Sequence, residues 1–128
     1  MSKVFDSNIL IYHLNGKLTE TAQEMMEQAI GEGACISVIT RIEILGWQGQ
    51  SEEALRRTKN FLDQFEEQSL SAEIVDKCIA LRQGRRLKIP DAIIAATALH
   101  LNLPLVTRNT EDFKGIEGLN FINPFVPG

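Results

Sequence analysis

Four acidic residues stand where an apolar run gives way to a polar segment. Three follow strand-like runs and one opens a helix-like segment; they are Asp6, Glu43, Asp91 and Asp112. Helix capping explains any one of them, because the free N–H groups and the dipole at a helix start favour negative charge. Their recurrence at such junctions indicates one shared site rather than four separate caps.

Carboxylates within a few ångströms repel one another and cannot all stay ionised unless a cation lies between them. Mg²⁺ and Mn²⁺ suit a site built of carboxylates and water, whereas Zn²⁺ prefers His or Cys ligands. The two His and two Cys residues lack the spacing of a zinc motif. We therefore expect the four acids to bind Mg²⁺ or Mn²⁺, and the sequence leaves open whether one ion or two bind.

A hard cation held by carboxylates serves a substrate that brings its own oxygens, namely a phosphodiester. The ion polarises the phosphoryl group and lowers the pKa of a water that attacks in line. Polar neighbours of the acids would orient that water or a phosphate, either Thr107 with Asn109 or Ser7 with Asn8. An RNA backbone would be held by the cations and by a basic strip, which comprises Arg85, Arg86, Lys88 and Arg108. A solvated turn is the competing interpretation of the first three.

Strand-like apolar runs alternate with helix-like segments along the chain, which is typical of βαβ units and a parallel sheet covered on both faces. The strand-like runs lie at 4–5, 34–39, 66–70, 105–107 and 119–122. In open α/β sheets, sites form at the carboxyl ends of the strands, where the strand order reverses. Such a sheet would gather Asp6, Glu43 and Asp112 at one edge.

Two predicted helices carry the remaining geometry. The segment 89–101 has the highest helix propensity, with Pro90 suited to the first turn and an Ala-rich run after it, so Asp91 would sit at the start of a buried helix. Thr40-Arg41-Ile42-Glu43 has the form of a capping box. That pattern offers a competing role for Glu43, as the reciprocal cap of Thr40.

A chain of 128 residues with 44% hydrophobic residues is long enough for one compact core and too short for two, so we expect a single domain over residues 1–128. The net charge of −4 excludes a broad basic field for nucleic acid, so RNA binding has to rest on a local strip or bound cations. We expect a cytoplasmic protein, because Met1-Ser2-Lys3 leads directly into a strand-like run and no segment approaches the roughly 20 apolar residues of a membrane span.

Four motifs in this order together resemble a PIN domain. They are Asp6-Ser7-Asn8, then Ser37-Val38-Ile39-Thr40 with Glu43, then Ile89 to Ala98 around Asp91, and finally Leu105 to Phe113. From Val4 to the Asn123-Pro124 tail the chain is similar to the VapC toxins of prokaryotic toxin–antitoxin pairs. The resemblance implies an α/β fold with three α/β/α layers and a short, mostly parallel central sheet of about five strands. It also implies a Mg²⁺- or Mn²⁺-dependent endoribonuclease with Asp6, Glu43 and Asp91 as its carboxylates.

The resemblance bears on the fourth acid and on partners. Many PIN domains have an aspartate two residues after the Thr of the fourth strand, where this chain has Asn109; VapC-like members often use the acid before Phe, here Asp112. We expect Asp112 to complete the site, with Asn109 as a neutral ligand of the water or metal. The resemblance further implies a homodimer and a cognate antitoxin whose basic side chain enters the acidic groove, with assembly on DNA through the antitoxin.

Two other functions remain open from the sequence. Asn109 and the acidic balance are compatible with a catalytically quiet PIN-like module that binds RNA or protein without cutting it. A small phosphohydrolase with Asp6 as covalent nucleophile is disfavoured, because position 8, where a second aspartate would be expected, is Asn8.

Overall fold

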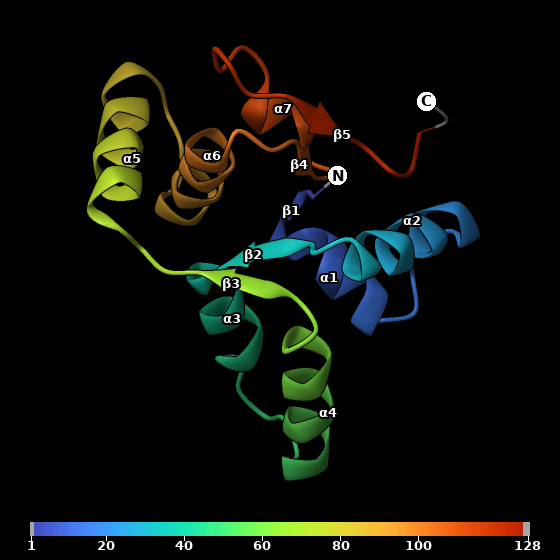
Figure 1. Cartoon of the computed structure of the whole chain (residues 1–128). Coiled ribbons are helices and arrows are strands. Elements are labelled where there is room, and N and C mark those ends of the chain that lie inside the picture. The colour runs from blue at the N-terminus through green and yellow to red at the C-terminus, as the bar shows by residue number, and fades with distance from the viewer. Residues whose placement is uncertain (1, 127–128) are drawn as a thin grey trace.

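One parallel sheet organises the molecule. The computed structural model describes residues 2–126, and within them five strands lie in the order β3-β2-β1-β4-β5 (Figure 1). The strands are β1 (Val4–Phe5), β2 (Cys35–Ser37), β3 (Glu66–Gln68), β4 (Leu105–Val106) and β5 (Phe121–Ile122). All four pairings are parallel. From β1 the chain first builds outward to β3 and then returns to β4 on the other side, so the strand order reverses between β1 and β4.

Helices cover both faces of this sheet. They are α1 (Ser7–Leu14), α2 (Glu20–Gly31), α3 (Val38–Leu45), α4 (Glu52–Leu62), α5 (Ala72–Gly84), α6 (Ile89–Leu101) and α7 (Thr110–Phe113). Figure 1 shows α5 and α6 on one side of the sheet and α1 to α4 on the other. The predicted three-layer α/β/α arrangement with a short parallel sheet is therefore confirmed.

Alternation along the short strands divides the core in two, because successive side chains of a strand point to opposite faces. Val4 and Leu105 belong to a core that includes α6 and α7. Phe5 and Val106, the next residues along the same strands, belong to a core that includes α1 to α4. Two-residue strands thus suffice to join both layers, since each residue is fully buried on its own face.

Helix α6 lies deepest. Its residues 92–98 are all buried, and Pro90 occupies the first turn as expected. The helix ends at Asn102, which adopts the left-handed conformation (φ 54°) that stops a helix and that Asn tolerates better than most residues. Small side chains such as Ala95 and Ala98 let neighbouring elements approach closely, so the start of α6 is held firmly against the sheet.

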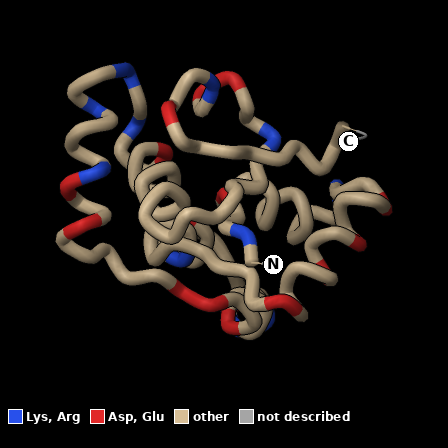
Figure 2. The backbone as a smooth tube through the Cα atoms, turned by 45° about the horizontal axis from the view of Figure 1, so that its top comes forward, with Lys and Arg blue, Asp and Glu red and all other residues tan. Residues whose placement is uncertain are grey.

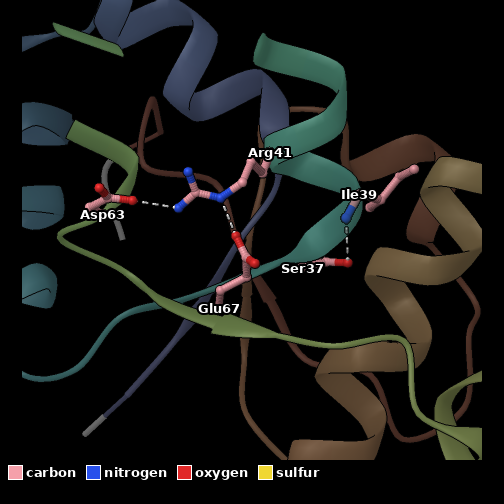
Figure 3. A network of polar contacts seen from close by, with 5 residues as sticks. All are labelled: Ser37, Ile39, Arg41, Asp63 and Glu67. Carbon is pink, nitrogen blue, oxygen red and sulfur yellow. Dashed lines mark hydrogen bonds and ion pairs between the residues drawn. The ribbon is translucent and has the colours of Figure 1, made fainter. Parts of the chain in front are cut away.

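The start of α3 differs from the sequence prediction. The strand expected over 34–39 ends at Ser37, and the helix begins at Val38. Ser37 is the N-cap, with its Oγ accepting a hydrogen bond from Ile39 N at 3.2 Å (Figure 3). Thr40 therefore lies inside the helix, and the capping box of Thr40 with Glu43 is wrong. The β-branched pair Val38-Ile39 was read as strand, but the Ser37 cap and the burial of Ile44 outweigh its weak local preference.

Arg41 ties α3 to the edge of the sheet. Its guanidinium donates to Asp63 Oδ1, 2.8 Å away at the end of α4, and to Glu67 Oε1 of β3 (Figure 3). One cation thus pairs with two carboxylates at this edge.

No helix within residues 2–126 has the length and apolar character needed to cross a bilayer.

Candidate active site

The centre of the site is the pair of residues that follow the two central strands. Asp6 follows β1 and Thr107 follows β4, and the Asp6 backbone N–H donates to Val106 O at 2.9 Å. Thr107 Oγ1 donates to Asp6 Oδ2 at 2.8 Å and accepts from Asn109 N at 3.0 Å. Thr107 is fully buried, so its hydroxyl orients Asp6 and the turn at Asn109. Thr107 Oγ1 also accepts from Asn8 Nδ2 at 3.4 Å, so Thr107 acts on the pocket through Asp6, Asn8 and Asn109.

Glu43 reaches the same edge from α3. Ser7 Oγ donates to Glu43 Oε1 at 2.8 Å and lies 2.9 Å from Thr40 Oγ1. Ser7 is the first residue of α1, directly after Asp6, so this contact brings α3 beside the end of β1. In the structure Ser7 positions Glu43, and its role in orienting water stays a prediction.

The remaining two acids, Asp91 and Asp112, come from α6 and α7, the helices that precede and follow β4. Asp91 lies half-buried in the first turn of α6, and Asp112 is exposed on α7. Asn109 Nδ2 donates to Asp112 Oδ2 at 2.6 Å. From the sequence, either Asn109 or Asp112 could have been the fourth residue of the carboxylate site. In the structure both lie at the site, and the Asn109 amide holds the Asp112 carboxylate through this hydrogen bond.

All four acids line one pocket at this edge, which we call the acid pocket. It has a volume of about 280 Å³ and is lined by Asp6, Asn8, Glu43, Lys88, Pro90, Asp91, Asn109 and Asp112. Asn8 and Asn109 are two of the four polar residues predicted to orient water or phosphate. The convergence matches the expectation that the ends of parallel strands and the start of α6 meet at the topological switch point.

The acids act on one another electrostatically. Burial raises the pKa of Asp6 to about 6, with smaller contributions from the charges of Asp91 and Glu43, while the Thr107 hydrogen bond partly offsets the rise. Burial likewise raises the pKa of Asp91, helped by Asp112 and Glu43 and opposed by Lys88. The pocket therefore concentrates negative charge that the protein itself neutralises only weakly.

The donor set fits a hard divalent cation. Every candidate ligand is a carboxylate or amide oxygen, and Asn8 Oδ1 is a buried acceptor for which residues 2–126 provide no hydrogen-bond partner. Within that same range, no three His, Cys, Asp or Glu side chains already form a cluster that could hold a metal. Side-chain rotation would have to close the acids on an ion, and mutual repulsion opposes such closure until a cation is present.

The predicted basic strip divides into two parts. Lys88 lines the acid pocket, and a second pocket beside it is lined by Lys88 together with Arg85 and Arg86. Arg108 lies elsewhere, with its guanidinium over the rings of Tyr12 at 5.1 Å and Phe125 at 4.2 Å. It lines neither of these two pockets as the described residues form them.

Sequence reasoning missed Arg82, which lines the second pocket from the last turn of α5. The available signal was sequence proximity, because Arg82 precedes Arg85 and Arg86 by only three and four residues, and α5 ends between them at Gly84. It was overlooked because Arg82 stands inside a helix whose other residues read as ordinary core and surface.

Comparison with known proteins gives consistent results. A family model described as PIN domain matches residues 3–119. A protein named Ribonuclease VapC from Rickettsia bellii (strain RML369-C) is 27% identical over 130 residues, covering 95% of this chain and 96% of the relative.

Solved structures agree in fold over nearly the whole chain. A chain of a toxin–antitoxin complex from Klebsiella pneumoniae is 36% identical with a TM-score of 0.77, covering 96% of this chain and 98% of that one. A chain of VapBC2 from Rickettsia felis, bound to a DNA fragment from its promoter, is 25% identical with a TM-score of 0.82, covering 96% and 98%.

Proposed function

The chain belongs to the PIN domain family, and on that premise we propose that it is a metal-dependent endoribonuclease, the toxin of a toxin–antitoxin pair. The observation that carries the proposal is the convergence of Asp6, Glu43, Asp91 and Asp112 on one pocket at the switch point of the sheet. Its similarity to a protein named Ribonuclease VapC supports RNA as the substrate.

In this proposal the four acids hold Mg²⁺ or Mn²⁺, and the buried Asn8 Oδ1 supplies a further oxygen to the ion or to its water. The bound ion would polarise the phosphodiester and make a water more acidic. The protein's own contribution is rigid placement. Thr107 fixes Asp6, Ser7 fixes Glu43 and Asn109 fixes Asp112, each through a hydrogen bond of 2.6 to 2.8 Å.

Lys88 has a separate role at the edge of the pocket. Its charge opposes the rise in the pKa of Asp91, so it lies close enough to act on that carboxylate. An ammonium group there also attracts the phosphate of an incoming RNA strand. Lys88 therefore favours the ionised form of Asp91 and helps to guide the substrate to the acids.

Partners follow from the same relatives. The matched structures from Klebsiella pneumoniae and Rickettsia felis are named as toxin–antitoxin and VapBC complexes, the second bound to DNA. These names support a cognate antitoxin for this chain and an assembly on DNA through that antitoxin. A homodimer and a cytoplasmic location complete the proposal.

The test is ribonuclease activity on single-stranded RNA with Mn²⁺, for the wild type and for Asp91→Asn. We expect the variant to lose two or more orders of magnitude, which corresponds to roughly 3 kcal/mol of transition-state stabilisation. Asp76→Asn is the matched control, because Asp76 is an exposed acid on α5 outside the acid pocket. A folded Asp91→Asn protein that cuts as well as wild type would show that Asp91 merely caps α6.

A catalytically quiet binding module is the alternative, and one observation favours it. Asn109 stands where many PIN domains have an aspartate, and its side-chain amide donates a hydrogen bond to Asp112. Calorimetric titration with Mn²⁺ separates the two functions. Absence of heat even at millimolar Mn²⁺ would favour the binding module.

A further inference from the structure

A second pocket adjoins the acid pocket, and we name it the basic pocket. It has a volume of about 480 Å³ and is lined by Arg82, Arg85, Arg86, Leu87, Lys88, Asp91 and Asp112. Three of these residues, Lys88, Asp91 and Asp112, also line the acid pocket, so the two pockets adjoin, and we call the pair the groove. Figure 2 shows the basic residues along the end of α5 and the turn that leads into α6.

Four cations in one concavity repel one another unless anions neutralise them. Within residues 2–126, none of the four makes an ion pair with a carboxylate, whereas Arg41 elsewhere pairs with two. The chain as a whole is acidic, with a net charge of −4, so this concentration of positive charge is local. The four basic side chains of the basic pocket are therefore available to bind an anion from outside the protein.

Two of the arginines are already held in place by the backbone. Arg82 Nε donates to Leu87 O at 3.1 Å, and Arg85 Nη2 donates to Lys114 O at 2.6 Å. Each bond uses one of five guanidinium N–H donors and leaves the others free to bind an anion. The Arg85 contact also joins the end of α5 to Lys114, which directly follows the helix that carries Asp112. Both guanidinium groups are thus fixed before any ligand arrives.

The rest of the acid pocket has a different character. Its lining residues that are not shared with the basic pocket include no cation; they are Asp6, Asn8, Glu43, Pro90 and Asn109. Arg108 is engaged with Tyr12 and Phe125. Lys88, the cation of the acid pocket, belongs to the side shared with the basic pocket. Positive charge therefore flanks the acids on one side of the groove.

From this asymmetry we infer that the basic pocket is a binding subsite for the backbone phosphate next to the scissile one, on one side of the cut. The inference rests on the proposed function for the identity of the polymer, and it adds a direction to it. A guanidinium fork binds phosphate oxygens in a bidentate manner, which suits Arg82 and Arg86 at the wall of the groove. The substrate is then held through its phosphate charge in the basic pocket, whereas the rest of the acid pocket offers the strand no cation from its lining.

Binding of uncleaved RNA tests the subsite without relying on catalysis. The probe is fluorescein-labelled hexauridylate in EDTA, measured by fluorescence polarisation from 50 to 300 mM KCl. We expect Arg86→Ala to weaken binding about tenfold at the lower salt concentrations and to reduce the salt slope by about 0.7, the value for one phosphate contact on a single strand. Arg86 is exposed and has no hydrogen bond or ion pair within the described residues, so its removal leaves the fold intact.

Arg56→Ala is the matched control, because Arg56 is an exposed arginine on α4 outside both pockets. We expect it to bind like wild type with an unchanged salt slope. Arg82→Ala provides a second variant from another element. Equal binding and equal salt slopes for wild type, Arg86→Ala and Arg82→Ala would overturn the subsite.

Cleavage with Mn²⁺ tests the direction. Oligonucleotides carry one neutral methylphosphonate on either side of the linkage that the protein cuts in the unmodified strand. We expect neutralisation on one side to raise KM about tenfold with kcat unchanged, and to add little in Arg86→Ala, because the two changes remove the same contact. Equal effects on both sides would contradict the inference.

The two arms separate this inference from the proposed function. If no variant and no wild-type preparation cuts RNA, yet Arg86→Ala still weakens binding, the endoribonuclease assignment fails and the subsite stands. If wild type cuts RNA while the arginine variants bind it normally, the subsite fails and the endoribonuclease assignment stands.

Discussion

Carboxylates meet in two regions of this molecule, and the two are built in opposite ways. At the edge of the sheet, Asp63 and Glu67 share Arg41, so a protein cation neutralises them (Figure 3). In the acid pocket, four carboxylates face one another with Lys88 as their neighbouring cation. Burial and mutual repulsion there raise the pKa of Asp6 and Asp91.

The difference indicates which region exists for stability and which for function. Paired and largely exposed charges cost little and contribute little. Buried like charges destabilise the folded state, and a protein retains such strain where a ligand relieves it. The carboxylates of the acid pocket thus need a cation from outside the protein to neutralise them, whereas Arg41 already neutralises Asp63 and Glu67 within the chain.

The largest expected effect is on the stability of the metal-free protein. Asp6 has a pKa of about 6 in the folded state against 3.8 ordinarily, so between these values the folded protein binds more protons than the unfolded one. Stability at Asp6 therefore falls as pH rises from about 4 to about 6, and a shift of this size corresponds to about 3 kcal/mol. Urea unfolding in EDTA at several pH values measures it.

Asp6→Asn removes this titration and serves as the comparison. We expect the variant to be more stable than wild type above pH 6 in EDTA and to gain nothing from Mn²⁺, whereas wild type regains stability when Mn²⁺ is added. Asp63→Asn should have the opposite sign, with a slight loss of stability at neutral pH and no dependence on Mn²⁺. A wild type whose stability advantage over Asp6→Asn grows with pH in EDTA would contradict the strained pocket.

A smaller effect is expected at Thr107, which holds Asp6 without facing the groove. Thr107→Val leaves Asp6 Oδ2, the Asn109 N–H and Asn8 Nδ2 without this partner, at a cost of about 1–3 kcal/mol. The Thr107 hydrogen bond lowers the pKa of Asp6, so its loss raises that pKa further. In EDTA, the pH profile of stability from urea unfolding should therefore move to higher pH in the Val variant. Thr107→Ser keeps the hydroxyl and should restore the wild-type profile. Identical profiles for all three proteins would mean that Thr107 only fills space.

The fold and the four acids were accessible to sequence reasoning because both follow local signals. Pro90 and the Ala-rich run fix the start of α6, and hence the place of Asp91, within one turn. The start of α3 was misplaced because Val38 and Ile39 favour strands locally, and only the Ser37 cap and tertiary packing decide for helix. Local propensity carries too little free energy to settle such a boundary.

Contacts between distant segments were beyond the sequence. The guanidinium of Arg108 lies over the ring of Phe125, seventeen positions further along the chain, a contact that the sequence did not predict, and binding of RNA by Arg108 stays a prediction. The hydrogen bond from Ser7 to Glu43 likewise joins residues 36 apart. Residue types revealed which groups were available, while the pairings depended on how the layers pack.

The smallest effect is expected at Arg41, and it tests whether the two regions are independent. Arg41→Met keeps the aliphatic contact and removes the charge. Since Arg41 is 24% exposed and Asp63 53% exposed, the loss should be below about 1 kcal/mol in thermal or urea unfolding. Activity with Mn²⁺ should remain within about twofold of wild type, because the Arg41 charge pairs away from the acid pocket. Arg41 and Glu43 share α3, however, and a tenfold loss of activity at unchanged stability would mean that the pairing at the sheet edge sets the position of Glu43.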